Sequence, residues 1–385
     1  MNTLSAALLF SIVACASLTA AEEPAEYRSI YSQDARYEAI RSNIYDYHLA
    51  AAQNSIDSLI AENPDDPKPY FFMTLVRWWY FLGDVNSRSF RTSFLKSAEK
   101  TVETGKKRVE AREDDVNALF YLGGAYGYLA RYYVFTNEWL DAYYYGRKAK
   151  NIFSDMLEDN DTLYDAQLAV GVYNYYADEL PALLKIFTSI FGLSGDKRLG
   201  LRQLHLAADS GIYSRVEALS MLGFVNLELE NNYQEAEAMF TGLFAEHMSN
   251  PVFGMLLSDS YRKLKNYERA ISICTGLLND SSIKYVSVNQ LAGLHAELAY
   301  CQMLARNYAF AIREYKICDS LAVDDYVRES PWIYFNVGVC EENEHNFSEA
   351  VVYYSKVLDC RDYFGYHSNA RKAIERIRSE HGAGH

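Results

Sequence analysis

One short pattern recurs four times in the second half of this 385-residue chain. An Asn followed directly by Tyr or Phe stands four residues before an Ala, and a large side chain or a Cys follows that Ala after four more residues. The pattern begins at Asn232, Asn266, Asn307 and Asn346, so its copies are 34, 41 and 39 residues apart. A stretch with the apolar spacing of a helix precedes each copy. Repetition at a period of about 20 to 50 residues is typical of stacked supersecondary units, so each copy is predicted to be the second helix of a helical hairpin.

Small residues within these units indicate how the two helices of a hairpin pack. Ala299 precedes Ala311 by 12 residues, and Gly338 precedes Ala350 by the same number, which places each pair at one level of a hairpin. Small side chains at such positions allow two helix backbones to approach closely. We therefore expect these residues to be buried between the helices.

The small-residue pair, the aromatic residue at the turn and the first period resemble the tetratricopeptide repeat. The resemblance covers residues 215–360 as four repeats, although two of the periods are longer than the roughly 34 residues typical of that repeat. It implies an all-α fold, a right-handed solenoid of antiparallel helical hairpins whose first helices line a concave groove. Residues 361–385 would then supply a capping helix and a tail.

The chain before these repeats is predicted to hold divergent helical repeats over residues 22–160. Pro64 and Pro67 are expected to end one helix and Pro69 to open the next. A further hairpin is expected after Asp115, with a long insertion before its second helix, which begins at Trp139.

An atypical helical segment is predicted at residues 161–214. It contains the runs Leu180-Pro181, Gly192-Leu-Ser-Gly-Asp-Lys-Arg198 and Gly200-Leu-x2-Leu204. These runs are similar to a motif of the inclusion-body-clearance (Iml-type) family, which consists of mitochondrial outer-membrane-associated repeat proteins with bacterial relatives. In physical terms, Asp196 is suited to capping a helix that begins after it, with Leu204 on the buried side of that helix.

The first 21 residues predict export. Residues 4–21 carry no charge, and small residues at Thr19 and Ala21 suit cleavage of a signal peptide after Ala21. The alternative is a lipoprotein signal, in which Ile12-Val13-Ala14-Cys15 is a lipobox and Cys15 becomes lipidated. Either alternative predicts a soluble mature domain that is periplasmic or associated with an outer membrane.

Composition and motifs exclude several classes of function. The 37 basic residues are outnumbered by 51 acidic ones, which argues against a nucleic-acid partner because such binding depends on Lys and Arg. The sequence has no recognisable catalytic, nucleotide-binding or metal-binding motif, so we expect no enzymatic activity, cofactor or metal. Five cysteines remain after Cys15; buried free thiols are favoured, and a disulfide such as Cys318 with Cys340 is the alternative.

The repeat register predicts which first-helix side chains line the groove. The candidates for partner binding are Asp259, Arg262, Lys263, Tyr300, Met303, Phe335, Glu342 and Asn343. Charges beside aromatic residues suit an extended peptide or a partner helix. We therefore expect a non-catalytic scaffold for protein interactions in the cell envelope. A membrane-attached module for a lipid or hydrophobic ligand, and an enzyme with an unrecognised site, are the alternatives.

Overall fold

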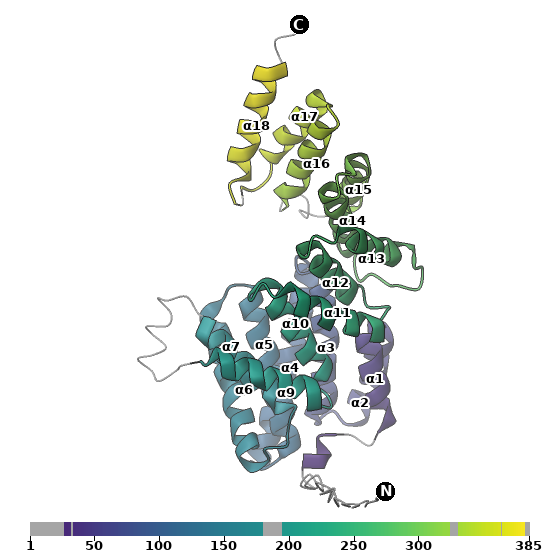
Figure 1. The fold of residues 1–385 in the computed structure, drawn as a ribbon. Coiled ribbons are helices and arrows are strands. Elements are labelled where there is room, and N and C mark those ends of the chain that lie inside the picture. The colour runs from purple at the N-terminus through teal and green to yellow at the C-terminus, as the bar shows by residue number, and fades with distance from the viewer. Residues whose placement is uncertain (1–26, 32–33, 180–194, 324–329, 363, 382–385) are drawn as a thin grey trace, which may run out of the picture.

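The structure is a computed structural model, and it describes residues 27–31, 34–179, 195–323, 330–362 and 364–381. Within these ranges the chain forms 17 α-helices and one short 3-10 helix, η1 (Tyr27–Ser29), and no strand. Figure 1 shows the helices stacked in chain order from purple to yellow. The predicted all-α solenoid of antiparallel hairpins is confirmed.

The helices pair into eight hairpins and a final helix. The pairs are α1 (Ala35–Tyr45) with α2 (Leu49–Glu62), α3 (Pro67–Gly83) with α4 (Arg88–Ala111), α5 (Val116–Phe135) with α6 (Trp139–Asp159), α7 (Ala166–Glu179) with α9 (Lys197–Ser210), α10 (Arg215–Glu228) with α11 (Tyr233–Glu246), α12 (Pro251–Lys263) with α13 (Tyr267–Asn279), α14 (Val288–Leu304) with α15 (Tyr308–Leu321) and α16 (Pro331–Asn343) with α17 (Phe347–Val357). The last helix, α18 (Tyr366–His381), packs against α17. First helices of neighbouring hairpins also contact one another, from α1 to α7 and again from α12 to α18. The first helices therefore form the inner layer.

One turn geometry joins the two helices in most hairpins. A single residue with positive φ precedes the second helix, as at Asn231, Lys265, Arg306 and His345, with φ between 54 and 64°. The same geometry occurs at Tyr47 and Asn137 in the divergent half. A residue in this left-handed conformation is a common way to end a helix and satisfy its last carbonyls. The amino-terminal half therefore shares this turn geometry with the later hairpins.

Two boundaries in the amino-terminal half differ from expectation. Helix α5 continues to Phe135, so only three residues separate it from α6, and the predicted long insertion is wrong. The apolar, tyrosine-rich stretch simply extends the first helix. Helix α3 opens at Pro67 rather than Pro69, because the Asp66 side chain accepts a hydrogen bond from the Lys68 backbone N–H and caps it.

Small residues lie where the helices of a hairpin pack most closely. Ala299, Ala311 and Ala350 are fully buried as predicted. A Cβ atom at Gly338 would lie only 2.7 Å from the Tyr354 ring, so this position has room for hydrogen alone. In the α7–α9 hairpin, a Cβ atom at Gly200 would lie 2.6 Å from the backbone nitrogen of Tyr175.

The central motif thus has a structural role in the residues that are described. Asp196 caps α9 by accepting a hydrogen bond from the Leu199 N–H at 2.9 Å, and Leu204 is fully buried, both as predicted. Gly195 lies against α7, where a Cβ atom would be 2.5 Å from the Asn174 carbonyl oxygen. The Leu180-Pro181 run and residues 192–194 of the motif lie outside the described residues.

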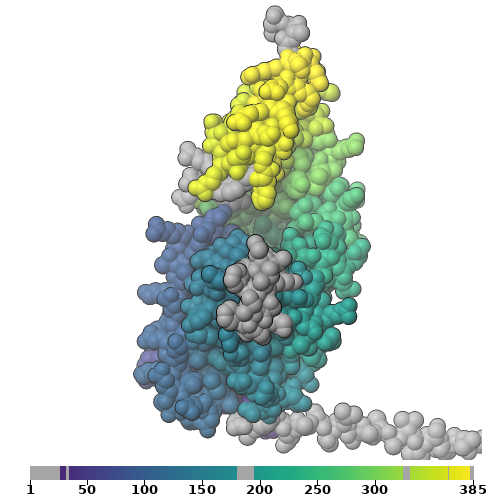
Figure 2. Space-filling model, turned by 90° about the vertical axis from the view of Figure 1, so that its left-hand side faces the viewer, coloured from purple at the N-terminus to yellow at the C-terminus, as the bar shows by residue number. Residues whose placement is uncertain are grey.

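The helices from α1 to α12 close on themselves. The α1–α2 turn meets the α11–α12 turn, where Asn250 Nδ2 donates to the Tyr45 carbonyl at 2.9 Å and Ser249 Oγ donates to the Asp46 carbonyl at 2.6 Å. Gln290 Nε2, at the start of α14, donates to Tyr47 Oη at 3.0 Å. These contacts join residues more than 200 positions apart. The helices from α1 to α12 therefore form a closed body, and Figures 1 and 2 show α16–α18 projecting beyond it.

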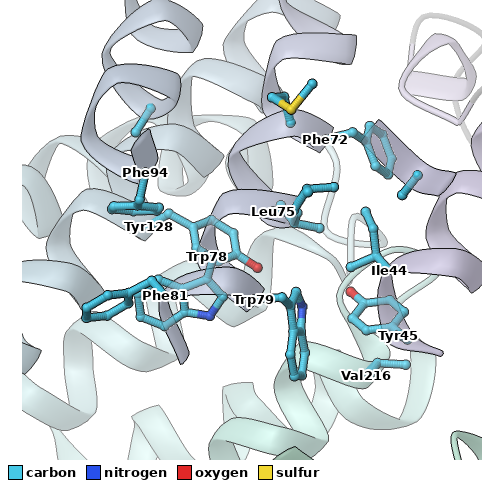
Figure 3. Close-up of a cluster of buried hydrophobic side chains, with 14 of the residues drawn as sticks. Ile44, Tyr45, Phe72, Leu75, Trp78, Trp79, Phe81, Phe94, Tyr128 and Val216 are labelled. Atoms are coloured by element: carbon cyan, nitrogen blue, oxygen red, sulfur yellow. The ribbon is translucent and has the colours of Figure 1, made fainter. Parts of the chain in front are cut away.

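The interior of this closed body is rich in aromatic side chains. Trp78 and Trp79 of α3 are essentially fully buried, and each contacts aromatic residues of different helices. Trp78 packs on Phe94 and Tyr128, whereas Trp79 contacts Phe253 across the closure with ring centroids 5.2 Å apart. Figure 3 shows the two indoles side by side in this cluster. Large aromatic areas removed from water supply much of the stability of such a core.

Candidate functional site

The predicted groove residues lie on the inner helices α12, α14 and α16, and Arg262 forms the centre of one group. Its Nε atom is 3.0 Å from Glu297 Oε1, it pairs with Asp259 through a second nitrogen, and its guanidinium lies 5.0 Å from the centroid of the Tyr300 ring. The structure therefore brings together three predicted residues and one that was missed, Glu297. A single acidic residue inside an apolar helix gave no sequence signal of its own.

Burial changes the acidity of this group. Loss of solvent raises the pKa of Asp259 to about 6, while Arg262 acts in the opposite direction and the negative charge of Glu297 adds to the rise. With both carboxylates ionised the group carries one negative charge in excess.

Four partly buried aromatic side chains continue this surface across α14, α16 and α18. They are Tyr300, Trp332, Phe335 and Tyr366, and we call them the aromatic strip. The ring centroids of Tyr300 and Trp332 are 6.1 Å apart, and those of Phe335 and Tyr366 are 5.4 Å apart. Burial raises the pKa of Tyr366, and the Tyr300 phenol adds to the rise. Trp332 and Tyr366 were missed because they stand outside the repeat positions used to assign the groove.

The remaining predicted residues do not join this group. Glu342 binds Arg376 of α18 at 2.7 Å and accepts a hydrogen bond from the Tyr354 hydroxyl. Lys263 lies over the Tyr233 ring. Met303 packs against the core between α14 and α16, and the Asn343 amide donates to the Val339 carbonyl of its own helix.

A large cavity inside the closed body was not predicted. It has a volume of about 560 Å³ and is lined mainly by apolar side chains of α1, α3, α5, α6, α7, α10 and α12. The aromatic residues of its wall are Tyr45, Phe71, Phe72, Phe120, Tyr128, Phe135, Trp139, Tyr143, Phe153, Tyr173, Tyr176, Tyr213 and Phe224. We call this space the central cavity. Its volume falls within the range of about 300 to 1,000 Å³ that is usual for small-molecule sites.

One polar cluster interrupts the apolar wall of the central cavity. Arg131 Nη1 donates to Glu217 Oε2 at 2.7 Å, and its guanidinium lies 4.7 Å from the centroid of the Trp78 ring. The other carboxylate oxygen of Glu217, the Tyr45 hydroxyl and the Ser214 hydroxyl are buried and have no hydrogen-bond partner within the described part of the chain. Burial, and then the charge of Glu217, raise the pKa of Tyr45 well above its usual value.

A second carboxylate of the wall, Asp165, is fully used. It accepts hydrogen bonds from the backbone N–H groups of Ile212, Tyr213 and Ser214 and from the Tyr31 hydroxyl. Asp165 therefore fixes the entry into α10. The four charged residues of the wall, Arg41, Arg131, Asp165 and Glu217, balance in sign.

The described ranges hold no metal-binding cluster, no helix that could span a membrane and no disulfide. No three His, Cys, Asp or Glu side chains of the described ranges gather to hold a metal ion. Among the helices described, none has the length and apolar character needed to cross a membrane. The five cysteines are buried free thiols, Cys318 and Cys340 included, and burial raises the pKa of each of these two to about 12. Residues 1–21, with Cys15, lie outside the described residues.

Comparisons with known proteins find helical-repeat folds at low similarity. No family model and no curated protein matches the chain in sequence. Yeast Tom70 is 12% identical over 92% of this chain and 83% of its own, with a TM-score of 0.42. A tetratricopeptide repeat protein from Parabacteroides merdae is 15% identical over 79% of this chain and 98% of its own, with a TM-score of 0.35. The human IFIT1 dimer with m7Gppp-AAAA is 11% identical over 87% of this chain and 70% of its own, with a TM-score of 0.46.

Proposed function

We propose that this protein is a non-catalytic scaffold that binds a segment of another protein, as a peptide or a helix, along the inner side of α12–α18. The observation that carries the proposal is the aromatic strip beside the Arg262 group. Interfaces of proteins are anchored by aromatic side chains that stand in partly desolvated surroundings, with charged groups at the edge. The strip offers the anchors, and the excess negative charge beside it selects a basic residue next to apolar ones in the partner.

The choice of variants follows from the contacts. Reversing the charge of Arg262 would leave a new carboxylate between Asp259 and Glu297, so that variant would disturb folding as well as binding. Tyr300→Ala and Tyr366→Ala remove anchors without leaving an unpaired charge. Phe310→Ala is the matched control, because Phe310 lies on the second helix α15 with 52% of its surface exposed.

The test has two stages. Proteins crosslinked to the wild type in native cells are identified by mass spectrometry, and the crosslinked segment of the partner is then titrated with each purified variant. We expect Tyr300→Ala and Tyr366→Ala each to weaken binding at least tenfold and to keep the helicity of Phe310→Ala, with a somewhat lower melting temperature because both tyrosines pack against buried clusters. Equal binding by all three variants would place the partner elsewhere and overturn the proposal.

We also propose that the protein is exported to the cell envelope, as a periplasmic or outer-membrane-associated domain. The support is the uncharged, small-residue-rich pattern of residues 1–21. The mass of the mature protein distinguishes the two forms of the proposal. Cleavage after Ala21 leaves Glu22 as the first residue, whereas a lipoprotein begins at an acylated Cys15. A full-length chain retained in the cytosol would contradict both.

We also propose that the chain is related to the Iml-type family. It is supported by Gly195, Asp196 and Gly200, which occupy the tight α7–α9 contact described above. The close contacts predict that Gly195 and Gly200 tolerate no larger residue, and the melting temperatures of Gly195→Ala and Gly200→Ala would check this structural role of the shared motif.

A further inference from the structure

We propose that the central cavity binds a neutral single-chain amphiphile, which is a long apolar chain carrying an uncharged head with hydroxyl or amide groups. The cavity lies inside the closed body, on helices other than those that carry the aromatic strip. This inference is therefore independent of the proposed protein partner.

The size and lining of the cavity point to an apolar ligand. The central cavity is partly open to solvent, has a volume of about 560 Å³ and includes thirteen aromatic residues in its wall. An apolar wall of this size favours a ligand that removes it from water. Water gains little there, since it needs two to four polar partners. A flexible hydrocarbon chain can pack against the apolar wall without forming hydrogen bonds.

The polar cluster specifies the head group. Glu217 has one carboxylate oxygen bound to Arg131 and one without a partner among the described residues, and only 3% of the residue is exposed. Unpartnered buried oxygens are unfavourable unless a ligand or an ordered water reaches them. The open Glu217 oxygen and the hydroxyl oxygens of Tyr45 and Ser214 have almost no solvent-accessible surface, so a hydroxyl or amide head can bond to them only after the side chains of the polar cluster shift to admit it.

Charge excludes the commoner alternatives. A fatty-acid carboxylate would lie beside the carboxylate of Glu217, whose partner Arg131 is already engaged. The charges of the wall balance, so an ionic head of either sign would be buried without a counter-charge, which is strongly unfavourable. An uncharged head avoids this cost.

The direct test uses 1-monooleoylglycerol as the probe, at concentrations below its aggregation limit, with purified full-length protein that has been stripped of lipid. We expect binding at one molecule per chain and a rise in melting temperature, because a ligand that binds only the folded state stabilises it. Oleate should bind at least tenfold more weakly. Absence of binding by the wild type, as would follow if the chain itself fills the cavity, overturns the proposal, and tighter binding of oleate overturns the assignment of the head group.

Two variants separate the chain site from the head site. Gly127 lines the cavity, and the nearest atom to a Cβ there would be that of Ala149 at 4.0 Å, so Gly127→Leu fills free space. It should fold and lose binding at least tenfold. Tyr45→Phe removes only an unpartnered hydroxyl, so it should keep its melting temperature and bind the probe about fivefold more weakly, the value of one hydrogen bond. Unchanged binding by Gly127→Leu would place the probe outside the cavity.

Control variants keep the two proposals distinguishable. Tyr285→Phe also removes a single phenol, but the Tyr285 hydroxyl donates to the Leu277 carbonyl far from the cavity wall. It should lower the melting temperature and leave affinity for the probe unchanged. Tyr300→Ala should bind the probe like the wild type even where it loses the protein partner, and loss of both activities would contradict their independence.

Discussion

The contact between Gly223 and Phe240 gives the most direct test of the helix packing. Gly223 lies in α10, and a Cβ atom there would be 2.7 Å from Cζ and 2.9 Å from Cε2 of the Phe240 ring in α11. Real Cβ atoms do not come so close, and the ring is fully buried, so it cannot retreat into solvent. Gly223→Ala therefore forces the two helices apart or moves the ring out of its rotamer.

The size of the effect follows from two opposing terms. Overpacking of a tight core typically costs about 1–3 kcal/mol, whereas replacing Gly by Ala within a helix gains about 1 kcal/mol. The difference between the two terms gives a loss of unfolding free energy of about 0–2 kcal/mol for Gly223→Ala. Gly242→Ala, in the second helix of the same hairpin, is the matched control because nothing lies within 4 Å of its added Cβ atom. It should raise stability by about 0.5–1 kcal/mol.

Urea unfolding followed by circular dichroism at the helical band measures both variants under the same conditions. Gly223→Ala should be less stable than Gly242→Ala by about 0.5–3 kcal/mol, the sum of the two expectations. The dependence of the unfolding free energy on urea concentration should be unchanged, because neither substitution alters the surface exposed on unfolding. If Gly223→Ala were as stable as Gly242→Ala, α10 and α11 would not approach as described, and the packing argument would be refuted.

Three further predictions concern charge, closure and register. The pKa of Asp259 is about 6 in the folded state against 3.8 for an unperturbed Asp, so the folded state binds this proton more tightly than the unfolded chain does. Asp259 therefore lowers the free energy of unfolding by up to about 3 kcal/mol as the pH rises from 4 to 6. Asp259→Asn should remove this pH dependence when urea unfolding is measured across that range. Tyr47→Phe leaves the buried Gln290 amide without its acceptor, so it should cost about 1–3 kcal/mol and speed hydrogen exchange at the start of α14. Ala311→Leu should destabilise by about 1–3 kcal/mol or more, and a melting temperature equal to that of the wild type would show that the register of α14 and α15 is wrong.

The hairpins could be predicted from sequence because their determinants are local. The Asn-aromatic turn, the Ala four residues later and the small residue of the first helix all act within one unit, and Ala311 and Ala350 lie where the repeat requires. Asp196 likewise caps its own helix three residues away. The error at the α5–α6 turn has a local cause as well. Residues 127–135 extend a helix whose apolar face is so wide that periodicity alone does not mark its end.

The closure of helices α1 to α12 and the central cavity could not be predicted from the sequence, because both depend on the sum of the small rotations between successive hairpins. Nothing in the neighbourhood of Tyr47 indicates that it will meet Gln290, 243 positions later. The same limit applied to Glu297, which looks like a solvated charge in its own helix and becomes a partner of Arg262 only when α12 and α14 pack together. The sequence therefore placed the candidate residues on α12, α14 and α16, whereas their ion pairs and their neighbour Tyr366 could not be predicted.

Helix α14 belongs to both parts of the molecule. Its first turn closes the body, since Asn289 Nδ2 lies 3.3 Å from Asp84 Oδ2 and Gln290 contacts Tyr47. Its later turns carry Glu297 and Tyr300, which begin the surface proposed for a partner. A helix of 17 residues is about 25 Å long and behaves as a rigid rod. The closure therefore fixes the direction in which α14 leaves the body, and with it the position of Tyr300 relative to the other aromatic residues of the strip.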